Sequence, residues 1–177
     1  MALATLIGIL TGWLRGGSLS NLARIEFRFW WLIVAAALIQ ASFPFLVDGV
    51  DYRLIFAAYL LSFALIIVAL AANFRKRFVP VILVGIAMNF AVIALNQGMP
   101  FYSEKYRSRA AEMKAVNGLH VPASEKTRLG YLGDWIAIPP PYPQPAILSP
   151  GDLVVSLGLF LFVQGAMVSS ASKGERR

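Results

Sequence analysis

Long apolar runs separated by short polar stretches form the main pattern of this chain. Four runs are long enough to cross a bilayer as helices, because a helix rises about 1.5 Å per residue and the hydrocarbon core is about 30 Å thick. They are residues 29–47, 52–73, 78–95 and 152–171. A fifth run, Ala2–Leu14, would reach only about 20 Å, so it spans a thinned bilayer, is extended by its flanks, or packs as a half-helix. The pattern predicts an all-α membrane protein of about five helices in a single membrane domain.

Composition supports a lipid solvent. The chain is 58% hydrophobic and 14% charged, whereas roughly a quarter of the residues in soluble domains are charged. A net charge of +7 would indicate nucleic acid in a soluble protein, but here the basic residues lie between apolar runs, where an anionic membrane surface explains them. We therefore expect membrane lipids as partners and no nucleic acid. Ala2–Leu14 lacks a basic leader and a cleavage site, so no removable signal peptide is expected.

Basic residues also predict the topology. They cluster in three segments that alternate along the chain so as to share one membrane face: Arg15, Arg24 and Arg28; Arg75, Lys76 and Arg77; Lys173, Arg176 and Arg177. The positive-inside rule places that face in the cytoplasm. The N-terminus is then outside, the C-terminus is cytoplasmic, and the expected location is the bacterial inner membrane.

The segment 98–151 is predicted to be one long outer loop. Ser103–Val116 has the pattern of a surface helix, and Asn117-Gly118 is a typical helix stop. The prolines of 139–145 favour an extended chain. Loops of this length often carry function, so we regard Asn96, Gln97 and Trp135 as interaction candidates.

Small and polar residues indicate how the helices pack. Ala4, Gly8, Gly12 and Gly16 recur every four residues, which favours close approach of a second helix. Gln40, Asn89 and Gln164 lie within apolar runs and should face other helices, either as interhelical contacts or, alternatively, along a proton or ligand path. No charged residue lies in the middle of a span, which argues against an ion-coupled transporter.

Two aspartates are the candidate catalytic residues. Asp134 and Asp152 both lie near the expected outer interface, and paired carboxylates that share a proton can activate water. Structural roles compete with this interpretation. Ser149, Pro150 and Asp152 form a helix-start signature, and Asp134 fits an Asx turn. His120 is alone, without a partner at metal-ligand spacing, and the chain has no cysteine, so we predict no metal site and no cofactor.

Three motifs carry a family resemblance. They are Gly16–Arg24 running into Trp30-Trp31, Asn96-Gln-Gly-Met-Pro100, and Leu132-Gly-Asp-Trp-Ile136 followed by Ser149-Pro-Gly-Asp152. Together they resemble an uncharacterised family of small bacterial multi-pass membrane proteins, a domain of unknown function. That resemblance implies a membrane fold and supplies no activity. The C-terminal part also resembles lipoprotein signal peptidases, which are intramembrane aspartyl enzymes. In those enzymes the first aspartate ends a membrane helix, whereas Asp134 lies in a polar loop.

Three functional hypotheses follow. The first is a non-catalytic structural or accessory subunit of a larger membrane complex, with other membrane proteins as partners. The second is an aspartyl enzyme at the membrane interface that uses Asp134 and Asp152 on lipid or lipoprotein substrates. The third is a membrane module that binds a small molecule or quinone, which would need a cavity lined by Asn89, Gln164 and aromatic side chains.

Overall fold

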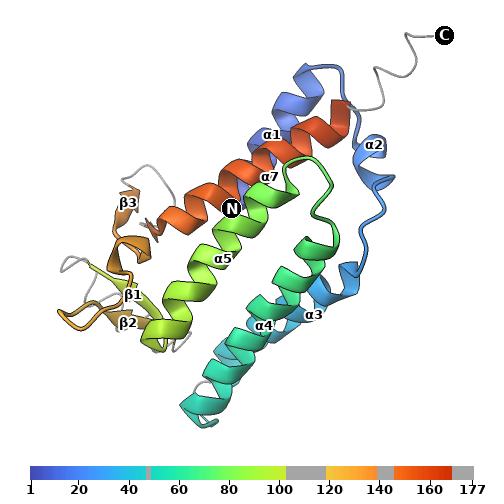
Figure 1. Cartoon of the computed structure of the whole chain (residues 1–177). Helices are drawn as coiled ribbons and strands as arrows, with labels where there is room; N and C mark the ends of the chain where they lie inside the picture. The colour runs from blue at the N-terminus through green and yellow to red at the C-terminus, as the bar shows by residue number, and fades with distance from the viewer. Residues whose placement is uncertain (47–48, 103–118, 139–145, 169–177) are drawn as a thin grey trace.

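The computed structural model describes residues 1–46, 49–102, 119–138 and 146–168, and within them the chain is mostly helical (Figure 1). The longer helices are α1 (Ala2–Leu14), α3 (Trp30–Leu46), α4 (Tyr52–Ala72), α5 (Val79–Asn96) and α7 (Pro150–Val168). A short helix, α2 (Leu19–Ala23), follows α1. The all-α class and the five apolar helices are confirmed, with starts and ends within one or two residues of expectation where they are described. The predicted surface helix 103–116, the proline run 139–145 and the basic tail lie outside the described residues.

Length and composition divide the five helices into two groups. Helices α4, α5 and α7, with 21, 18 and 19 residues, are long and apolar enough to cross a membrane. Helices α1 and α3 are shorter. Residues 29–47 were expected to form one full span, but Phe29 has a φ of 57°, so the α3 helix starts after it and has 17 residues. The chain is thus a mostly helical membrane protein with three candidate spans and two shorter apolar helices.

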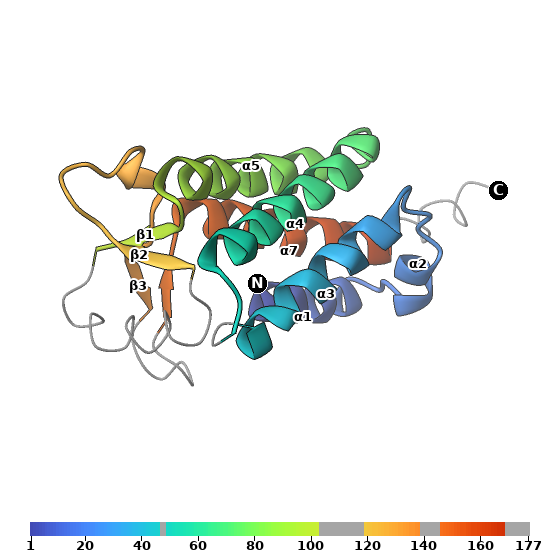
Figure 2. The same cartoon turned by 90° about the horizontal axis from the view of Figure 1, so that it is seen from below.

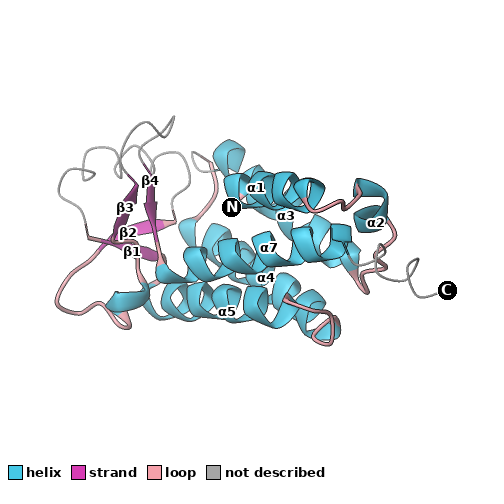
Figure 3. Cartoon of the chain, turned by 90° about the horizontal axis from the view of Figure 1, so that it is seen from above, coloured by secondary structure: helices cyan, strands magenta, loops and turns pink. Residues whose placement is uncertain are grey.

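The helices pack in an order that differs from their order along the chain. Helix α7 packs between α1 and α5, and α4 packs between α5 and α3. The row is therefore α1–α7–α5–α4–α3, in which the first helix contacts the last one described. Figures 2 and 3 show the strands at one end of the bundle, along the direction of the helix axes, and α2 at the other end. We call these the strand end and the basic end, the latter because Arg15, Arg24 and the α4–α5 turn lie there.

Helix α1 covers only part of α7. Gly8 lies against Phe160, where an added Cβ would be 3.1 Å from the carbonyl oxygen, and Gly12 lies against Gln164, at 3.3 Å from its Cα. Both contacts involve the C-terminal half of α7, and the N-terminus of the chain lies midway along the bundle (Figures 1 and 3). Helix α1 therefore packs along the C-terminal half of α7.

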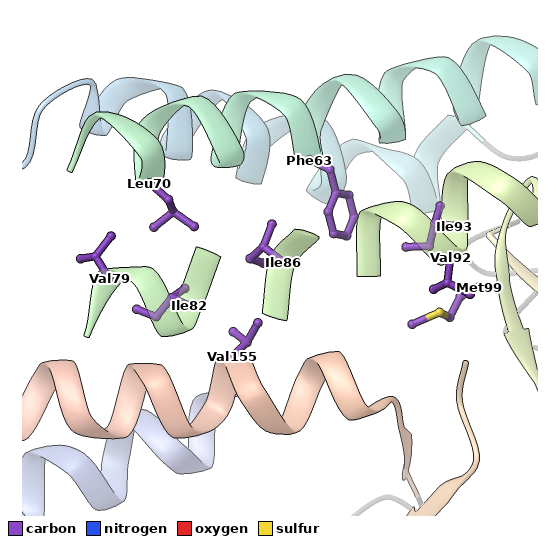
Figure 4. Packing of buried hydrophobic residues seen from close by; sticks show 9 residues of the cluster. All are labelled: Phe63, Leu70, Val79, Ile82, Ile86, Val92, Ile93, Met99 and Val155. Atoms are coloured by element: carbon purple, nitrogen blue, oxygen red, sulfur yellow. The ribbon is translucent and has the colours of Figure 1, made fainter. Parts of the chain in front are cut away.

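A hydrophobic core joins α4, α5 and α7. Figure 4 shows side chains of α4 and α7 pointing toward α5 from its two sides. The buried members of the core are Phe63, Leu70, Val79, Ile82, Ile86, Val92, Ile93, Met99 and Val155. Glycines allow α5 and α7 to approach closely: a Cβ on Gly85 would lie 2.7 Å from the carbonyl oxygen of Gly151, and one on Gly158 would lie 2.7 Å from Ile82. This approach positions the polar groups described below.

Short strands organise the segment between α5 and α7. Strand β1 (Met99–Phe101) pairs in parallel with β2 (His120–Pro122), and β3 (Ile136–Ile138) pairs antiparallel with β4 (Ala146–Leu148). A 3-10 turn, Gly130–Leu132, lies between β2 and β3. Expecting this segment to be a loop with one surface helix therefore missed its strands. Three-residue strands are too short for alternation of apolar and polar residues to reveal them.

Candidate functional site

A buried polar network joins α5 to the start of α7 at the strand end. The Asn89 side chain is 4% exposed and Ser149 is fully buried. Nδ2 of Asn89 donates to Oδ1 of Asp152 at 2.8 Å, and the Ser149 hydroxyl donates to Oδ1 of Asn89 at 3.0 Å. Gly151 makes room for the amide, because a Cβ at that position would overlap Oδ1 of Asn89. The amide of Asn89 thus uses both of its polar atoms between two helices.

The same residues cap α7. The Asp152 N–H donates to the Ser149 hydroxyl at 3.0 Å, and the Ser149 N–H donates to Oδ2 of Asp152 at 3.2 Å. This reciprocal pair is a capping box, with Pro150 as the first helical residue. The predicted helix-start role of Asp152 is confirmed. Both carboxylate oxygens of Asp152 are therefore engaged within the fold.

Asp134 is buried and bound to β1, whereas its expected place in a polar loop suggested an exposed residue. Its N–H donates to the Pro100 carbonyl at 2.7 Å and its carbonyl accepts from Tyr102 at 3.1 Å, so the backbone is bound along β1. The residue is 5% exposed, and its Oδ2 lies 3.5 Å from Nε2 of His120. Among the described residues Oδ1 has no hydrogen-bond partner, so the expected Asx turn is not formed. The expectation that His120 is an isolated loop residue is likewise wrong.

Burial shifts the chemistry of this carboxyl. It raises the pKa of Asp134 above the usual value, the nearby Asp152 carboxylate raises that pKa further, and His120 opposes both. Nδ1 of His120 is also buried and has no hydrogen-bond partner within the part of the chain that the structure describes. With Oδ2 of Asp134 at 3.5 Å from Nε2 of His120, the pair can share or pass a proton. No hydrogen bond joins Asp134 to Asp152, although both are described and lie at the strand end.

The other candidate residues are distributed along the bundle. Gln40 of α3 donates to the Ser62 hydroxyl of α4 at 2.9 Å, and Gln164 of α7 accepts from Arg15 at 2.8 Å. Asn89 bonds to Asp152, and Gln164 lies 12 positions further along α7, about 18 Å away along the helix axis. Asn89 and Gln164 therefore do not line one cavity.

The glycine stripe of α1 ends before its last predicted member. Ala4 is half-buried and Gly8 and Gly12 are buried, but Gly16 lies beyond the helix end at Leu14. It has a φ of 76°, and an added Cβ would meet nothing within 4 Å. Gly16 serves the turn after α1, where a left-handed conformation favours glycine.

The residues singled out after α5 hold the strand segment in place. The Asn96 side chain accepts from the Arg128 N–H at 2.9 Å and donates to the Arg128 carbonyl at 2.8 Å. Gln97 ends α5 in a left-handed conformation, and its carbonyl accepts from the Tyr52 hydroxyl. Trp135 is 54% exposed, and its indole N–H donates to the Tyr131 carbonyl at 3.0 Å. Of these three residues, Gln97 and Trp135 are exposed and Asn96 is half-buried.

Sequence reasoning missed the link between His120 and Asp134. The two residues come together because β2 pairs with β1, and Asp134 forms an isolated bridge to Phe101 of the same strand. No spacing rule encodes that pairing. In the part of the chain that the structure describes, no three His, Cys, Asp or Glu side chains gather in a way that could hold a metal ion.

Comparison with known proteins assigns the chain to a family but gives no activity. No curated protein and no solved structure matches it. A family model described as a family of unknown function (DUF5317) matches residues 24–164, which include α3 to α5, the strand segment and the network at the start of α7. The chain therefore belongs to this family of unknown function, DUF5317.

Proposed function

We propose that this membrane protein has a non-catalytic role, as a structural or accessory subunit of a larger membrane complex. The observation that supports this most is that α1 has 13 residues whereas α7 has 19. Helix α1 covers the C-terminal half of α7, and beyond its start Leu153 and Leu157 of α7 are 46% and 53% exposed. A helix from a partner protein would complete the row at this position, next to the α5–α7 contact that glycines already bring close.

The polar network is consistent with that role. Both oxygens of Asp152 and both polar atoms of the Asn89 amide are used to hold α5 and α7 together. Polar groups engaged in this way stabilise a scaffold, because an unpaired amide in lipid costs several kcal/mol.

We further propose that the basic end faces the cytoplasm of the inner membrane and the strand end faces outward. The support is charge: Arg15, Arg24, Lys76 and Arg77 all gather at one end of the bundle. The chain has no cysteine, so Arg75→Cys and Ser124→Cys variants can each be probed with a membrane-impermeant maleimide. We expect labelling of the Ser124 variant alone in intact cells, and labelling of the Arg75 variant alone would overturn this orientation.

The subunit role is tested by cross-linking in the native membrane. A photoreactive amino acid at Leu157 should capture a distinct protein, whereas the same group at the buried Val155, which is 2% exposed, should not. Purification in a mild detergent should return the same protein with the chain. A free monomer that cross-links only to lipid from Leu157 would overturn the proposal.

A second candidate function is an interface enzyme acting on lipid or lipoprotein substrates. The observation in its favour is the buried Asp134 carboxyl, 3.5 Å from His120, because each side chain has one buried polar atom to which no described residue bonds. Here Asp134→Asn should change the membrane lipid or lipoprotein profile while leaving the protein level unchanged. Glu125→Gln, at an exposed carboxylate of the same segment, is the matched control. Equal profiles in wild type and the Asp134 variant would exclude this candidate.

A further inference from the structure

A pocket of about 710 Å³ lies at the basic end, between segments that are distant in the sequence. Arg15 follows α1, Arg24 ends α2, Lys76 and Arg77 belong to the α4–α5 turn, and the last turns of α7 complete the wall. Four cationic residues therefore line one hollow, and no carboxylate is among the described residues that line it.

The fold holds this arrangement in place. The C-terminal end of α7 is capped by the region after α1, because the Met167 carbonyl accepts from the Ser18 N–H at 3.1 Å and from Nδ2 of Asn21 at 2.7 Å. Arg15 is fixed by its hydrogen bond to Gln164. These bonds tie the segment after α1 to the last described turns of α7.

One wall of the pocket is apolar. Phe78 and Phe162 line it together with the cations, and the Arg77 guanidinium lies 4.7 Å from the centre of the Phe78 ring. A small soluble anion would leave that wall uncovered, whereas a lipid would place its phosphate on the cations and its acyl chains against the rings. Basic pockets between membrane helices are suited to phosphate-bearing headgroups, which guanidinium groups bind through paired hydrogen bonds.

We propose that this pocket is a binding site for an anionic phospholipid. The phosphate lies among Arg15, Arg24, Lys76 and Arg77, and the glycerol and upper acyl chains lie along Phe78 and Phe162. This assignment is independent of the subunit role and of the orientation proposed above.

The test compares two double variants of the full chain in an uncharged detergent, with binding followed by native mass spectrometry. Arg24→Gln/Arg77→Gln removes two charges from the pocket and leaves the Arg15–Gln164 bond intact. Arg28→Gln/Arg75→Gln removes two charges from the same end of the bundle but outside the pocket lining, so it is the matched control. The probes are phosphatidylglycerol, phosphatidylcholine with the same chains, and glycerol 3-phosphate.

Wild type should bind phosphatidylglycerol at least tenfold more tightly than either other probe. The pocket variant should lose at least tenfold in that affinity and the control less than twofold, with equal thermal unfolding midpoints. If the pocket variant is unstable, Arg24→Gln alone should still lose threefold or more. Equal losses in both double variants would mean diffuse surface attraction, and equally tight binding of glycerol 3-phosphate would mean a site for soluble anions; either result overturns the proposal.

Discussion

The two ends of the bundle differ in the burial and the hydrogen bonding of their polar residues. At the strand end, Asn89, Ser149 and Asp152 bind one another within 3.2 Å and are buried or half-buried. At the basic end, Arg15, Arg24 and Arg77 are exposed, and among the described residues the one hydrogen bond from their guanidinium groups is that of Arg15 to Gln164. Helix α7 connects both ends, so one helix combines a region built for stability with a region available to a ligand.

This difference arises because a buried group loses its hydration, whereas a group near the membrane surface keeps it. A buried amide or carboxylate loses hydration and must recover it from the protein. A cation near the membrane surface stays hydrated or binds lipid phosphate, so it adds little to the stability of the fold. Substitutions at the strand end should therefore affect unfolding, and substitutions at the basic end should affect binding.

The largest effect is expected from Gly151→Ala. The added Cβ would overlap the Asn89 amide and lie 2.9 Å from the Gly85 carbonyl oxygen, so the helices must separate. We expect a loss of roughly 2–3 kcal/mol in unfolding free energy, measured by denaturant titration in detergent micelles. Gly49→Ala is the control, because a Cβ there meets nothing within 4 Å. Equal stabilities of the two variants would contradict the close contact.

Asp152→Ala should have the next largest effect. It removes the capping box, worth about 1 kcal/mol, and the interhelical bond to Asn89, worth roughly 0.6–1.7 kcal/mol. A double-mutant cycle with Asn89→Ala isolates the second contribution and should give a coupling energy of about 0.5–1.5 kcal/mol. Additive losses would show that the two side chains act independently. The polar residues of the strand end would then not stabilise the fold through their bond to each other.

The raised pKa of Asp134 predicts that the stability of the protein depends on pH. Its folded-state pKa is raised above the usual 3.8, so the contribution of this group to stability is present below that value and is lost as the pH rises through the raised pKa. Relative to Asp134→Asn, wild type should become less stable as the pH rises from about 4 through the raised pKa of Asp134. Unfolding of both proteins across this range measures the difference, and His120→Gln controls for titration of the imidazole. A difference that grows in favour of wild type with rising pH would contradict the burial of this carboxyl.

The smallest change in unfolding free energy is expected for the Arg24→Gln/Arg77→Gln variant, measured without lipid. Its unfolding free energy should stay within about 0.5 kcal/mol of wild type, as for most surface substitutions. A loss as large as that of Asp152→Ala would show that the basic end also stabilises the fold and would remove the contrast between the two ends.

The sequence was informative where one residue pattern determines one structure. Apolar runs predicted the helices, and Ser149, Pro150 and Asp152 predicted the start of α7, because both patterns are local. Gly16 was placed in the packing stripe by its spacing alone, although the helix ends at Leu14 before reaching it. The His120–Asp134 contact was missed because it depends on the pairing of β1 with β2 across intervening chain, which no local pattern records.

The contact between α1 and α7 also sets an order of events during synthesis. Helix α1 leaves the ribosome before α7. Its glycine face cannot pack until α7 has been synthesised, nearly the whole chain later. At roughly 5–20 residues per second, that delay is on the order of 10 s. Completion of this bundle is therefore a late, post-insertion step that depends on the last helix described.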